Sequence, residues 1–106
     1  MDEKVPVVKE LSRNEQRLAR MLKALGNPIR FQIMRTLAER QVCITGEIVD
    51  TTSLAQSTVS QHLKVLREAG LIRTAKQGVE HRNVLREEDI NARFPGLLKL
   101  VLKLAA

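Results

Sequence analysis

The sequence predicts a mainly α-helical domain that carries one small β-hairpin. Two observations support this fold class. Apolar residues recur at helical spacing over residues 13–69, and a stretch of strand-like residues broken by a glycine turn follows over residues 71–85. A chain of 106 residues is expected to form one domain, residues 1–106, with a modest core that a second subunit would enlarge.

Two helices are predicted in the first part of the chain, after a polar N-terminus, residues 1–11, that we expect to be mobile. Ser12 and Glu15 have the spacing of a capping box, which starts the first helix. Gly26 ends it, and Asn27-Pro28 starts the second. The apolar faces of the two helices are expected at Leu18, Met21, Leu22 and Leu25, and at Ile29, Ile33, Met34 and Leu37.

A second helical pair, residues 46–69, follows a short extended link at residues 42–44. Gly46 to Asp50 reads as a short helix and Thr51 to Leu54 as a tight turn, and a longer helix follows. The longer helix has an apolar stripe at Val59, Leu63 and Leu66. Its opposite face carries Ser57, Gln61 and Lys64, with Ser60 on the flank. This order is typical of a helix-turn-helix whose second helix is exposed.

The start of the longer helix leaves two capping alternatives. Ser53 and Gln56 have capping-box spacing, so Ser53 could cap a helix that begins slightly early. Otherwise Ala55 stands at the N-cap, where it offers no side-chain acceptor.

The hairpin, residues 71–85, is expected to have strands at residues 71–75 and 79–85, joined by a turn at residues 76–78. Gly78 can take the positive φ that such a turn requires. Arg73, Lys76 and Arg82 make the hairpin basic, which suits contact with phosphates; the plainer interpretation is three solvated charges.

The final segment, residues 95–106, is predicted to be a helix that is apolar almost all round and must therefore be buried. Lys99 and Lys103 form its only polar strip. We expect it to form a dimer seam; the alternative is a core helix within one subunit. The residues assigned to dimerisation are Leu18, Leu22, Leu98, Val101 and Leu102.

The composition favours duplex DNA as the partner. There are 18 Lys and Arg against 12 Asp and Glu, for a net charge of +6 and a pI near 10.1, which favours a polyanion. With two Phe and neither Tyr nor Trp, the chain lacks the rings on which single-stranded bases stack. No apolar stretch approaches the roughly 20 residues that span a bilayer, and the N-terminus lacks the features of a signal peptide. One cysteine fits a reducing cytoplasm, where we expect the protein.

Three motifs in the right order resemble the ArsR/SmtB family of small winged-helix repressors. They lie at residues 25–37, 56–64 and 68–72, and the resemblance covers residues 22–85. It implies a winged helix-turn-helix that is dimeric through its first and last helices and represses transcription from an inverted-repeat operator. The helix face and the family positions together select the DNA contacts Gln56, Ser57, Thr58, Ser60, Gln61, Lys64, Lys76 and Arg82.

No metal site, cofactor or enzymatic activity is expected. Many family members bind a metal or arsenic through a Cys-x-Cys pair, but here Cys43 is followed by Thr45 at the second position. His62 and His81 are not spaced as a chelating pair, and no catalytic constellation is present. Two alternatives remain open: a regulator that responds to oxidation of Cys43, and a winged helix that binds proteins instead of DNA.

Overall fold

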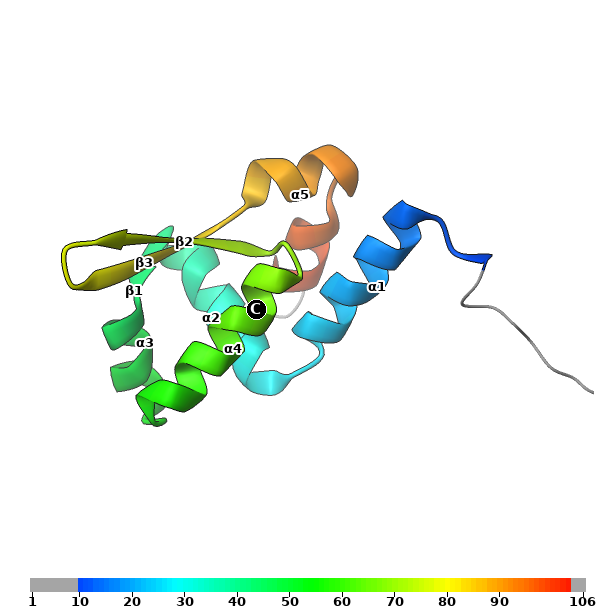
Figure 1. Cartoon of the computed structure of the whole chain (residues 1–106). Helices are drawn as coiled ribbons and strands as arrows, with labels where there is room; N and C mark the ends of the chain where they lie inside the picture. The colour runs from blue at the N-terminus through cyan, green and yellow to red at the C-terminus, as the bar shows by residue number, and fades with distance from the viewer. Residues whose placement is uncertain (1–9, 104–106) are drawn as a thin grey trace, which may run out of the picture.

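The computed structural model describes residues 10–103 (Figure 1). The predicted mobile N-terminus therefore lies almost wholly outside the described residues. The elements, in chain order, are α1 (Arg13–Leu25), α2 (Pro28–Arg40), β1 (Val42–Ile44), α3 (Thr45–Thr52), α4 (Gln56–Glu68), β2 (Ile72–Gln77), β3 (Glu80–Leu85), α5 (Glu87–Arg93) and a π-helical segment, η2 (Lys99–Lys103). The predicted fold class, mainly helical with a small β-hairpin, is confirmed.

The first two helices start as their cap residues predict. The Ser12 side chain accepts from the Glu15 backbone N–H at 3.1 Å, and the Glu15 carboxylate accepts from the Ser12 N–H at 2.9 Å. Asn27 Oδ1 accepts from the backbone N–H groups of Ile29 and Arg30. Each cap satisfies donors that a helix start leaves without an intrahelical partner.

The sheet has three antiparallel strands in the order β1-β3-β2. The link predicted at residues 42–44 is β1, and it pairs with β3 so that Cys43 lies opposite Asn83. The hairpin loop consists of Gly78 and Val79 alone, whereas the predicted turn spanned residues 76–78, because Lys76 and Gln77 still pair with His81 and Glu80. Gly78 has a φ of 63°, as the first residue of a II′ turn requires.

The core lies between α1, α2 and α4, and α3, the sheet and α5 close around it (Figure 1). The hairpin projects from one end of the molecule, and α1 lies at the other. Helical spacing predicted most of this core correctly. The fully buried side chains include Ile33, Met34, Leu37, Val59, Leu66, Leu71 and Ile90.

The C-terminal segment differs from the long α-helix predicted for residues 95–106. Its winding is π-helical over Lys99–Lys103, and residues 104–106 lie outside the described residues. Leu98 and Leu102 are only 5% and 7% exposed, and they belong to the hydrophobic core of the chain. A segment that is apolar at nearly every position has no single preferred face, so its periodicity fixes neither its winding nor its orientation.

Candidate nucleic-acid interface

The outer face of α4 is a continuous polar surface. All six of its predicted DNA contacts are exposed, whereas Val59, Leu63 and Leu66 on the opposite face are buried. The buried stripe holds α4 against α2 and α3, so the polar face is presented by a fixed helix. The exposed residues are Gln56, Ser57, Thr58, Ser60, Gln61 and Lys64.

The two ends of α4 are built differently. Ala55 is the N-cap and makes no side-chain cap bond, so the second capping alternative is confirmed. Ser53 cannot cap α4, because it is the left-handed C-cap residue of α3, with a φ of 59°. At the other end the N–H of Gly70 donates to the Arg67 carbonyl and that of Leu71 to the Leu66 carbonyl, which is a Schellman motif. Gly70 has the left-handed φ of 79° that this motif needs.

Strand alternation divides the basic residues of the hairpin between its two faces. Lys76 lies opposite His81, and this pair shares a face with Thr74 and Asn83. Arg82, in register with Ala75, lies on the other face and makes an exposed ion pair with Glu80 at 3.9 Å. Among residues 10–103 Lys76 makes no ion pair, so it can contact a phosphate directly, whereas Arg82 would have to leave Glu80.

A cleft of about 360 Å³ lies between α4 and the hairpin. It joins two of the predicted contacts on α4 to Lys76, and it adds four polar residues that sequence reasoning missed, which are Thr45, Arg67, Thr74 and His81. The strand alternation on the Lys76 face could have found Thr74 and His81, and the helical spacing from Ser60 and Lys64 could have found Arg67. The lining residues are Thr45, Gln56, Ser60, Leu63, Arg67, Thr74, Lys76 and His81.

A buried polar network fixes the hairpin against β1 and α3. The fully buried Asn83 side chain accepts from the Thr74 hydroxyl at 2.7 Å and donates to the Cys43 carbonyl at 3.0 Å and the Thr45 hydroxyl at 3.1 Å. Arg67 of α4 donates to Thr74 at 3.3 Å, so the network also reaches the exposed helix. A satisfied buried amide of this kind restricts the position of each element it joins.

His62 links α4 to the start of α2. Arg30 lies with its Nη1 at 3.3 Å from His62 Nδ1, and its Nε donates to the Ala24 carbonyl at 2.8 Å. Partial burial and then the positive charge of Arg30 lower the pKa of His62 below its ordinary value. A neutral His62 is therefore favoured, because only the neutral ring can accept at Nδ1.

Cys43 is a packing residue in this structure. It is 1% exposed, and burial, followed by the nearby Glu47 carboxylate, raises the pKa of its thiol. A reactive thiolate needs exposure and a lowered pKa, so neither condition for thiol sensing is met here. Within residues 10–103 no three His, Cys, Asp or Glu side chains gather as a metal site requires, and no helix of that range is long and apolar enough to cross a membrane.

The predicted dimerisation residues divide into two groups. Leu98 and Leu102 are buried within the chain, where they are 5% and 7% exposed. Leu22 is 48% exposed, Leu18 and Val101 are half-buried, and Leu100 adds an exposed apolar side chain that the sequence analysis did not assign.

Comparison with known proteins agrees with this geometry. The family model described as "Bacterial regulatory protein, arsR family" matches residues 27–74, which run from the cap of α2 into β2. The transcriptional activator HlyU of Vibrio cholerae is 31% identical over 93 residues, which are 88% of this chain and 85% of HlyU. The chain belongs to the ArsR family. It is thus a transcriptional regulator, as its relatives are, and those relatives are not enzymes.

One further relative and two solved structures describe the range of this family. The repressor SmtB of Mycobacterium tuberculosis is 42% identical over 60 residues, which are 57% of this chain but only 44% of SmtB. The structure of HlyU covers 85% of this chain and 97% of its own, with a TM-score of 0.70. The homodimeric winged helix-turn-helix domain Mb0332 of Mycobacterium bovis is 27% identical, with a TM-score of 0.70, and covers 97% of this chain and 91% of its own.

Proposed function

We propose that this ArsR-family regulator is a cytoplasmic homodimer that represses transcription by binding an inverted-repeat operator in duplex DNA. The observation that carries the proposal is the exposed polar face of α4, which continues through the cleft to Lys76 of the hairpin. A helix of this kind fits the major groove while the hairpin follows the neighbouring phosphates.

The proposed contacts divide by chemistry. Amide and hydroxyl groups can hydrogen-bond base edges, and cations neutralise phosphates without reading sequence. Base or near-base contacts are assigned to Gln56, Ser57, Thr58, Ser60 and Gln61, and phosphate contacts to Lys64, Lys76 and Arg82.

The dimer proposal rests on the apolar surface of α1 and the C-terminal segment. Leu22 of α1 and Leu100 of η2 are large apolar side chains that one subunit leaves exposed. The related domain Mb0332 is homodimeric, which supports the same assembly here. A dimer would place two α4 helices on successive half-sites of one DNA face.

The repressor role is supported by the similarity to SmtB, a repressor, although HlyU is named as an activator. A dimer seated on a promoter would exclude polymerase. Transcription in vitro from a promoter that contains the operator should fall as protein is added, and a rise would assign the activator role instead.

DNA binding itself is tested by fluorescence anisotropy with an inverted-repeat duplex selected from random DNA. We expect half-sites about 10 base pairs apart, and an affinity that falls steeply with added salt, since phosphate contacts release counterions. A protein that selects no duplex and shows no salt dependence would instead be a protein-interaction module.

A further inference from the structure

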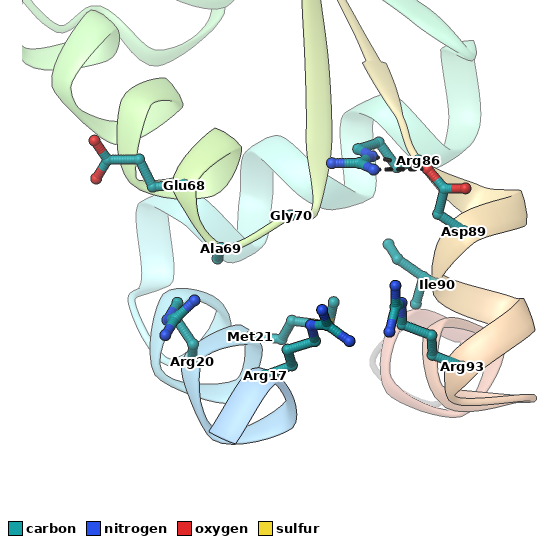
Figure 2. A pocket seen from close by; sticks show the side chains of 10 residues that line it. All are labelled: Arg17, Arg20, Met21, Glu68, Ala69, Gly70, Arg86, Asp89, Ile90 and Arg93. Carbon is teal, nitrogen blue, oxygen red and sulfur yellow. Dashed lines mark hydrogen bonds and ion pairs between the residues drawn. The ribbon is translucent and has the colours of Figure 1, made fainter. Parts of the chain in front are cut away.

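A second basic site lies away from the proposed DNA surface. It is a cavity of about 260 Å³ between α1, the turn that joins α4 to β2, and α5 (Figure 2). We call it the arginine pocket. Its charged lining residues are Arg17, Arg20, Glu68, Arg86, Asp89 and Arg93.

The acidic residues of the pocket do not balance its arginines. Asp89 is engaged by Arg86, which donates from Nε at 3.0 Å and from Nη2 at 2.8 Å. The Glu68 carboxylate points away from the opening in Figure 2. Among the described residues, Arg17 and Arg93 form neither an ion pair nor a side-chain hydrogen bond.

The orientation of Arg17 and Arg93 indicates that the pocket suits an anion between them. Arg17 extends from α1 and Arg93 from α5, and Figure 2 shows their guanidinium groups directed into the same opening. Like charges that converge repel one another. An anion placed between them would turn this repulsion into attraction.

We propose that the arginine pocket binds a small, doubly charged oxyanion, such as a phosphate ester or a dicarboxylate. Arginine presents a planar fork that binds two oxygens of such a group at once. The volume admits a small molecule, and Met21 and Ile90 provide an apolar floor for its carbon atoms. The pocket adjoins the C-terminal end of α4 and shares no lining residue with the cleft between α4 and the hairpin, although Arg67 of the cleft directly precedes Glu68 of the pocket.

The site is located by amide NMR of the intact protein titrated with inorganic phosphate at constant ionic strength. We expect saturable shifts at Arg17, Gly70 and Arg93. Succinate in a parallel titration distinguishes the two ligand sources, and saturable binding of either supports the proposal. Shifts confined to α4 and the hairpin, or none beyond those that chloride causes, would overturn it.

The residues are tested with the double variant Arg17→Gln/Arg93→Gln. Loss of two charge-assisted contacts should weaken binding of the anion that binds the intact protein at least about tenfold. The matched control, Lys64→Gln/Lys76→Gln, removes two cations from the DNA surface and should leave that affinity unchanged.

Two results of this comparison would contradict the proposal. Unchanged anion affinity in the arginine variant would show an adventitious site. Dissociation of a dimer in that variant, with unchanged anion affinity, would show that an acidic side chain of a second copy fills the pocket instead.

Discussion

Gln61 and Lys76 have different proposed tasks at the DNA, and single substitutions separate them. Gln61→Ala should cost about 1–3 kcal/mol of operator binding and relax specificity at one base pair, because an amide reads a base edge. Lys76→Ala should weaken binding to all sequences alike and reduce the salt slope by about one, because it removes one phosphate contact. Anisotropy on operator and random duplexes measures both effects.

Matched controls are available on other helices. Gln32→Ala on α2 and Lys23→Ala on α1 change exposed side chains of the same types away from α4 and the hairpin. Both controls should bind the operator with the affinity of the unaltered protein. If Gln61→Ala and Lys76→Ala affected operator and random DNA identically, the assignment of base and phosphate contacts would be wrong.

Asn83 holds the hairpin in place, so its loss should destabilise the fold. Asn83→Ala leaves the Cys43 carbonyl and the Thr45 hydroxyl without their buried donor. We expect a loss of about 1–3 kcal/mol in the free energy of unfolding, measured by urea denaturation. The control Asn91→Ala, at an exposed position of α5, should be close to neutral; a neutral Asn83→Ala would show that the network is not stabilising.

His62 should make stability depend on pH. Because its folded pKa is depressed, the unfolded chain binds the proton more readily, and stability falls as pH drops below the ordinary histidine pKa of about 6.5. The free energy of unfolding should therefore decline less between pH 7 and pH 5.5 in His62→Gln than in the unaltered protein. The control His81→Gln changes an exposed ring and should keep the original decline; an unchanged decline in His62→Gln would refute the coupling.

Sequence reasoning located the exposed face of α4 because helical periodicity fixes which residues share a face. It missed Thr45, Arg67, Thr74 and His81, because their place in the cleft depends on packing between elements distant in the sequence. It also grouped Lys76 with Arg82, which strand alternation separates.

At the scale of elements, α4 begins without a side-chain cap, and this can be repaired. Ala55→Ser supplies an acceptor for the free N–H groups of the first turn and should raise the free energy of unfolding by about 0.5–2 kcal/mol. Urea denaturation measures the gain. The same change at Ala92, an exposed position within α5, should give no gain; an equal gain there would show that capping is not the cause.

Local signals predicted the elements whose ends are set by their own residues. Ser12, Asn27 and Gly70 fixed three helix ends, because each acts within one turn of the chain. The pairing of β1 with β3 was not predicted, because three residues show no strand period and their partner lies about 40 positions away. The π-helical winding of η2 was not predicted, because apolar residues lie on nearly every side of this segment and their spacing therefore marks no single face.

At the scale of the whole molecule, basic side chains gather in two regions. One lies along α4 and the hairpin, and the other is the arginine pocket beside α1 and α5 (Figure 2). The pocket borders α1, through which we propose the dimer forms. An anion bound in the pocket would therefore lie where it can favour or oppose dimerisation. Dimerisation would in turn change the affinity of the pocket for the anion by the same factor.

Assembly is the property on which tight operator binding should depend. Leu22→Asp places a charge on the proposed seam while leaving the core of the subunit intact, since Leu22 is exposed in one subunit. We expect the dimer to dissociate, because a carboxylate buried in an apolar seam has no partner. Analytical ultracentrifugation should show a monomer that binds an isolated half-site weakly and no longer binds the full repeat tightly. Val79→Asp puts the same charge on a side chain that is 95% exposed at the hairpin tip, and it should remain dimeric. A dimeric Leu22→Asp would move the seam away from α1.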